Sequence, residues 1–99
     1  MIERYVLLLF ADGVSDDLFA ELSQRLPNLY RIVGIKLGLT NNEIDVIEVD
    51  NRLVQDITMK VLCRWKQRKG SAATRTSLVN ALLAARCIEE AEFVRNYKV

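Results

Sequence analysis

The sequence predicts an all-α protein that consists of six helical segments. Gly13, Pro27, Gly38 and Gly70 divide the chain into pieces of helix length. Within these pieces, apolar residues recur at helical spacing. The chain contains a single proline, which disfavours a loop-rich all-β fold.

The composition bounds the class of protein. The 99 residues suffice for one compact domain, and the fractions of 51% hydrophobic and 27% charged residues are typical of globular proteins. A net charge of +1 gives no overall electrostatic reason to bind nucleic acid or a membrane surface. Because the chain has no histidine and only two cysteines, we expect no metal centre, no cofactor and two reduced thiols.

The first predicted helix follows Ser15 and runs to about Leu26. Ser15 can accept a hydrogen bond from the first turn, Asp16 and Asp17 favour its positive end, and Pro27 ends the helix.

A second helix is predicted over about residues 28–37, followed by Gly38 in the left-handed conformation that often ends a helix. Gly34 costs this helix about 1 kcal/mol of propensity, so we expect tertiary packing to hold it. The apolar residues expected on one side are Leu29, Ile32, Val33 and Leu37.

A capping box from Thr40 to Glu43 predicts a short third helix. We expect Ile44, Ile47 and Val46 to face inward. The acidic outer face comprises Glu43, Asp45, Glu48 and Asp50.

Asp50 or Asn51 is expected to cap a longer fourth helix, which Gly70 ends. We expect Cys63 to point away from its apolar stripe and to be accessible, and Cys87, in the turn before the last helix, to be less accessible. The stripe comprises Val54, Ile57, Thr58, Val61, Leu62 and Trp65.

The last third of the chain predicts two more helices. The segment from about Thr74 to Arg86 is apolar almost all round, which is typical of the buried centre of a bundle. The sixth helix is short and has glutamates on its outer side. Its inward residues are Ile88, Ala91, Phe93 and Val94.

The longest apolar run, from Tyr5 to Phe10, lies near the N-terminus. Its six residues are far fewer than the roughly 20 that span a bilayer. The run also lacks the basic start and small-residue cleavage site of a signal peptide. We therefore expect residues 1–14 to dock on the core as a short helical segment, and the protein to be cytoplasmic.

The order of several short motifs resembles the death domain family over about residues 15–96. The motifs are Lys36-Leu37-Gly38-Leu39-Thr40, Glu43-Ile44-Asp45, Ile47-Glu48, Trp65-Lys66, Ala73-Thr74, Leu78-Val79, Ala81-Leu82 and Ala91-Glu92-Phe93-Val94. Within the family, the second half of the chain is most similar to the Fas-associated adaptor with death domain. On this resemblance, residues 1–99 form a single death domain.

The resemblance implies a six-helix antiparallel bundle with Greek-key connectivity, which agrees with the six segments found independently. It also implies homotypic association with other death domains, in receptor tails, adaptors or kinases, which builds oligomeric complexes in apoptotic or innate immune signalling. The sequence contains no nucleophile paired with a base, no glycine-rich phosphate loop and no metal-spaced ligands. We therefore expect a non-enzymatic protein.

Charge is distributed unevenly along the chain. Acidic residues dominate residues 1–24 and 41–50, whereas basic residues dominate residues 52–75. Oppositely charged patches on one molecule favour head-to-tail contacts that do not close. The alternative is that these charges only solvate the outer faces of the helices. The predicted interface residues are Asp16, Asp17, Glu21, Glu43, Asp45 and Glu48 on the acidic side, and Arg31, Lys36, Arg64, Arg68 and Lys69 on the basic side.

Nucleic-acid binding is the rival hypothesis. Lys60, Arg64 and Arg68 recur every four residues along the fourth predicted helix, in a line that can contact phosphates. The neighbouring acidic faces would repel the same phosphates, and no reading helix follows a helix-turn-helix. The sequence therefore favours protein association over nucleic-acid binding.

Overall fold

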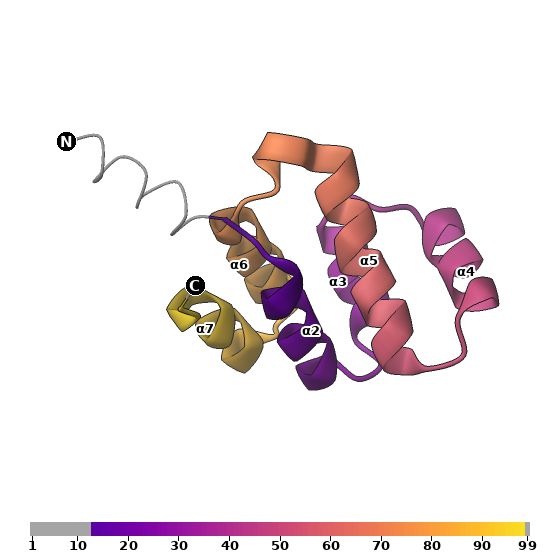
Figure 1. Ribbon diagram of the computed structural model, residues 1–99, viewed down its shortest axis with the longest axis horizontal. Helices are drawn as coiled ribbons and strands as arrows, with labels where there is room; N and C mark the ends of the chain where they lie inside the picture. Colours follow the sequence, from indigo (N-terminus) through magenta and orange to yellow (C-terminus); the bar gives the residue numbers. More distant parts are fainter. Residues whose placement is uncertain (1–12, 99) are drawn as a thin grey trace.

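The computed structural model describes residues 13–98, and these residues form six α-helices and one 3₁₀ turn without any strand (Figure 1). The all-α prediction is confirmed. The expected docking of residues 1–14 falls almost entirely outside the described residues. In chain order the elements are α2 (Asp16–Arg25), α3 (Tyr30–Lys36), α4 (Asn41–Asp50), α5 (Val54–Lys69), η1 (Gly70–Ala72), α6 (Arg75–Ala84) and α7 (Ile88–Asn96).

The helices pack in an order that differs from their order in the chain. The first helix, α2, packs mainly against α5 and α7, while α3 contacts α4, α5 and α6. The long helix α5 therefore lies between the two halves of the bundle, and α4 and α7 lie at opposite ends of the view in Figure 1. This arrangement is a bundle with Greek-key connectivity. Within residues 13–98 there is no helix with the length and apolar character needed to cross a bilayer.

Three of the helices begin at side-chain caps, and the sequence predicted two of them, at Ser15 and Thr40. The hydroxyl of Ser15 accepts a hydrogen bond from the backbone N–H of Leu18 at 3.2 Å. Thr40 and Glu43 form the reciprocal capping box at the start of α4, where the Glu43 N–H lies 3.2 Å from the Thr40 hydroxyl oxygen. At the start of α6, the Thr74 hydroxyl oxygen accepts a hydrogen bond from the backbone N–H of Ser77 at 3.1 Å. These local signals fix the starts of α2, α4 and α6.

The second helix starts later than predicted, at Tyr30. Asn28 adopts a φ of 62°, a left-handed conformation that cannot belong to a right-handed helix, so the turn after Pro27 extends to Leu29. The inward side of α3 also differs from the prediction, because Leu29 and Ile32 are 39% and 45% exposed.

The orientation of α3 follows from a close contact at Gly34. A Cβ atom built on this glycine would lie 3.0 Å from both Ile44 Cδ1 and Val61 Cγ1. The absence of a side chain therefore lets α3 approach α4 and α5 closely, with Gly34 and Val33 on the buried side. Leu29 and Ile32 then point outward.

The fourth helix begins at Val54, three residues after Asn51 and four after Asp50, the two predicted caps. The side-chain amide of Asn51 donates to the carbonyl oxygen of Ile47 at 2.9 Å, so Asn51 closes α4 and does not start α5. The N-cap of α5 is Leu53, which makes no side-chain hydrogen bond to the helix. The predicted stripe of α5 faces the core, and Trp65 is 2% exposed.

Several apolar residues that were expected to face inward are exposed. Val46 is 61% exposed, because α4 packs only on its α3 and α5 side. Leu83 and Ile88 are also exposed, so α6 is covered on only part of its circumference and α7 presents its first residue to solvent. Cys87 is buried and Cys63 is half-buried, in the predicted order of accessibility, although Cys63 packs against the core and does not point away from it.

Candidate interaction surfaces

Helices α3 and α4 are joined by a network around Arg31. Its guanidinium donates to Asp45 at 2.7 Å and also pairs with Glu48. The Tyr30 hydroxyl donates to the second oxygen of Glu48 at 2.7 Å. Hydrogen bonding to Asp45 raises the pKa of Arg31, and the hydrogen bond to Glu48 raises the pKa of Tyr30. Three of the predicted interface residues therefore contact one another within one chain.

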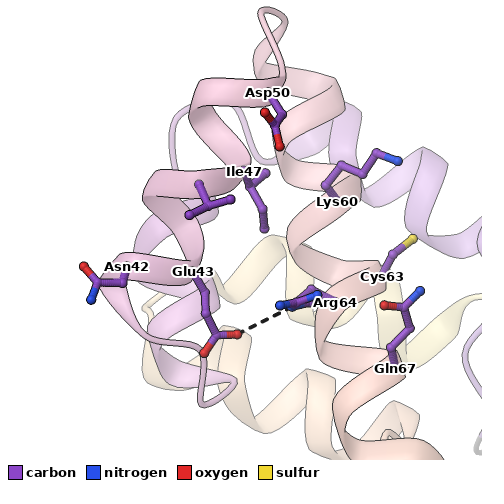
Figure 2. Close-up of a pocket in the computed structure, with 9 residues that line it drawn as sticks. Asn42, Glu43, Ile47, Asp50, Lys60, Cys63, Arg64 and Gln67 are labelled. Atoms are coloured by element: carbon purple, nitrogen blue, oxygen red, sulfur yellow. Dashed lines mark ion pairs between the residues drawn. The ribbon is translucent and has the colours of Figure 1, made fainter.

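A second network joins α4 to α5 through Glu43. This carboxylate pairs with Arg68 and lies 3.7 Å from the Nε atom of Arg64 (Figure 2). It also takes part in the capping box with Thr40, and its side chain is only 16% exposed. The hydrogen bond from Arg68 is the main reason that the pKa of Glu43 is lowered. Glu43 was predicted on a solvated acidic face, but it is a partly buried ion-pair partner.

The acidic residues of α2 are arranged differently. The Asp16 carboxylate oxygen Oδ1 lies 4.0 Å from the Lys66 Nζ atom, and the Asp16 side chain is 80% exposed. Asp17 and Glu21 are exposed and form no ion pair with any residue in 13–98. Their charges act on Tyr97 at the end of α7, whose pKa is raised by burial first and by Glu21 and Asp17 next.

Two lysines converge near the C-terminal ends of α3 and α5. Lys36 and Lys69 line a pocket of about 250 Å³ together with Leu37, Trp65 and Ser77. Both lysines are exposed, and neither forms an ion pair within the described part of the chain. The pocket therefore presents two ammonium groups without a carboxylate partner among these residues.

A groove of about 440 Å³ lies between α4 and α5. Figure 2 shows Ile47 between the two helices, with Asp50 and Lys60 on opposite walls at one end and the Glu43–Arg64 pair at the other. Val46 and Cys63 also line the groove. The sequence did not predict this groove, because Val46 was expected to face the core.

The eleven predicted interface residues thus divide into two groups. One group is already paired between helices of the same chain: Arg31, Glu43, Asp45, Glu48, Arg64 and Arg68, with Asp16 at the limit of pairing distance. The other group, which has no ion-pair partner within residues 13–98, comprises Asp17, Glu21, Lys36 and Lys69. A role of either group in an interface stays a prediction.

The line of cations on α5 that suggested nucleic-acid binding is also altered by these pairs. Arg64 and Arg68 both contact Glu43, which leaves Lys60 as the one member of the line without an ion pair in the described part of the chain. Phosphates would have to compete with this carboxylate for two of the three cations. No cluster of acidic or sulfur ligands that could hold a metal ion occurs within residues 13–98.

The six-helix bundle carries its charged networks and several exposed apolar side chains, among them Val46 and Ile88, on its outer surface. The family model of the death domain matches residues 16–98, which is most of the chain. The chain therefore belongs to the death domain family. Domains of this family are protein-protein interaction modules in signalling, and their partners are other death domains.

Proposed function

We propose that this chain is a non-enzymatic adaptor or signalling module of the cytoplasm that assembles oligomeric complexes with other death domains in apoptotic or innate immune signalling. Membership of the family supports homotypic partners. The likeness of the second half to the Fas-associated adaptor supports the adaptor role in particular.

The observation that carries the proposal is the presence of opposite charges that are not paired within the described chain. Asp17 and Glu21 are exposed on α2, and Lys36 and Lys69 converge on the pocket at the ends of α3 and α5. Because the two sets come from different elements and have opposite sign, the acidic set of one molecule is complementary to the basic set of another. Such a contact is heterologous and can continue from copy to copy.

Residues already paired within the chain are less suited to this contact. A neighbour that binds Arg31 must displace Asp45 or Glu48, so part of the new attraction only replaces an existing one. The unpaired set has no such internal competitor within residues 13–98. We therefore assign the main electrostatic contact to the four unpaired residues.

The test uses two double variants and sedimentation velocity over a concentration series. Asp17→Lys/Glu21→Lys makes both surfaces basic, and Lys36→Glu/Lys69→Glu makes both acidic. Each double variant alone should associate more weakly than the wild type, because every contact then joins like charges. An equimolar mixture should restore association, because alternating copies again present opposite charges.

The control is Arg52→Glu, which shifts the net charge in the same direction as the basic-set variant but alters an exposed residue of the α4–α5 loop that belongs to neither set. It should associate like the wild type, and raised salt should weaken the wild type. The mechanism is wrong if both double variants, alone and mixed, behave like the wild type. Capture of purified death domains of other proteins is measured in parallel, and a DNA gel shift that falls steeply with salt would favour the nucleic-acid alternative.

A further inference from the structure

Two of the exposed apolar features of the described molecule are of opposite shape, one concave and one convex. The concave feature is the α4–α5 groove, where Val46 is 61% exposed. Its volume of about 440 Å³ lies within the range of roughly 300–1,000 Å³ that is usual for ligand sites. The convex feature is the turn between α6 and α7, where Ile88 is 62% exposed.

The α6–α7 turn presents Ile88 on a firmly packed backbone. Cys87, directly before it, is 4% exposed, and its N–H donates to the carbonyl of Leu82 at 2.8 Å. Arg86 has a φ of 63°, the left-handed conformation that reverses the chain after α6. A projecting side chain on a fixed turn loses little conformational freedom when it is buried by a partner.

The charges beside these two features are complementary. In the groove, Asp50 on α4 and Lys60 on α5 stand on opposite walls, and neither forms an ion pair within residues 13–98 (Figure 2). Beside Ile88, Arg86 and Glu89 are exposed and are likewise without an ion pair in this range. The turn thus offers a basic, an apolar and an acidic residue to a groove that has an acidic wall, an apolar floor and a basic wall.

The two features are far apart on one molecule. In Figure 1, α5 lies between α4 on one side and the α6–α7 pair on the other. A turn cannot reach the groove of its own chain across the bundle, so these two features can meet only between two copies. A contact between different surfaces of two identical copies is heterologous and leaves a free groove and a free turn at the ends of every assembly.

We propose that the α6–α7 turn of one copy docks in the α4–α5 groove of a second copy, with Ile88 against Val46 and Ile47, Glu89 beside Lys60, and Arg86 beside Asp50. The contact rests on the proposed homotypic association and adds an apolar contact to the electrostatic one described above.

The apolar part is tested with Ile88→Ser, measured by sedimentation velocity over a concentration series. The dissociation constant should rise by about tenfold or more, because a buried apolar anchor is lost. Ile32→Ser is the matched control, since Ile32 is an exposed isoleucine on α3 that does not line the groove. It should leave the dissociation constant within about twofold, and both variants should keep the thermal midpoint of the wild type because both sites are exposed.

The pairing itself is tested by exchanging charges. Glu89→Lys alone and Lys60→Glu alone should each weaken association, because each creates a like-charge contact in every junction. The double variant Glu89→Lys/Lys60→Glu, and an equimolar mixture of the two single variants, should both restore it. The double variant also regains the net charge of the wild type, so Glu89→Lys/Arg52→Glu serves as its control: it has the same net charge but reverses an exposed cation that does not line the groove, and it should not restore association.

The outcomes separate this contact from the proposed function. Association of the wild type that is unchanged by Ile88→Ser and by the single charge reversals would overturn the turn-in-groove contact and leave homotypic association standing. A wild type that is monomeric at every concentration but captures other death domains would have the same meaning. A wild type that neither self-associates nor captures any death domain would overturn both.

Discussion

Replacing Gly34 by alanine tests the close approach of α3 to α4 and α5. Alanine is favoured over glycine inside a helix by about 1 kcal/mol, so propensity alone predicts a more stable protein. However, the new Cβ would lie 3.0 Å from Ile44 Cδ1 and Val61 Cγ1, closer than packed carbons normally approach. Overpacking of a core typically costs about 1–3 kcal/mol. We therefore expect Gly34→Ala to lower the free energy of unfolding by about 1 kcal/mol.

A double variant isolates the steric part of this effect. The end of the Ile44 side chain can move away, whereas the branched Cγ1 of Val61 lies close to its own backbone and has little freedom. In a Val61→Ala background, Gly34→Ala should therefore become stabilising by up to about 1 kcal/mol, the helix propensity that remains once the contact is removed. Urea denaturation of the four proteins measures both steps. The packing argument fails if Gly34→Ala already stabilises the protein with Val61 in place.

Three further predictions concern the core, the thiols and the Glu43 network. Trp65→Ala should remove roughly 3–5 kcal/mol of stability, seen in a denaturant melt, because the indole is 2% exposed; an unshifted midpoint would contradict its burial. Alkylation of the native protein followed by mass spectrometry should label Cys63 before Cys87, and equal rates would contradict their difference in exposure. Because Arg68 lowers the pKa of Glu43 below its ordinary value of 4.5, the stabilisation by this carboxylate is present above that pH and is lost as the pH falls through the lowered pKa. Thermal melts of the wild type and Glu43→Gln should therefore converge in acid, and a constant difference down to low pH would refute the ion pair.

The parts of the fold that the sequence predicted well depend on interactions between near neighbours. The predicted caps at Ser15 and Thr40 join residues three positions apart, so the residue types at that spacing specify the helix start. The errors occur where contacts with residues of another helix determine the role of a side chain. Asn51 has the chemistry of an N-cap, but its amide finds the carbonyl of Ile47 in the preceding helix. Periodicity could not show this, because the same sequence allows Asn51 either to end one helix or to start the next.

The burial of individual faces depended on helix packing and was harder to predict. Val46 and Ile88 are apolar and lie at positions that a wheel can assign to the core, yet α4 and α7 are end helices with few neighbours. A residue is buried only if another element covers it, and no spacing rule states which element that is. The α4–α5 groove and the exposed α6–α7 turn could therefore not be predicted from the sequence.

The candidate interface also combines properties that the sequence predicted with contacts that only the packing of the helices determines. The sequence identified the charged residues correctly as exposed or partly exposed, but Arg31 lies 14 residues from Asp45, and Arg68 lies 25 residues from Glu43. Only the packing of α3, α4 and α5 brings these partners together. The sequence could therefore predict the presence of opposite charges but not which of them neutralise one another.

The internal pairs change how a charge reversal at this surface has to be interpreted. Glu48 accepts from both Tyr30 and Arg31, so a lysine at this position removes two contacts between α3 and α4 and places a cation beside Arg31. Weakened association of such a variant would combine a disturbed bundle with a lost contact, and the two effects have the same sign. Asp17 has no ion-pair partner to lose within the described chain, so its reversal costs only the favourable charge at the start of α2, about 0.3–1 kcal/mol, and breaks no contact between helices. Residues that are unpaired in the monomer are for this reason the ones whose substitution reports on a neighbour.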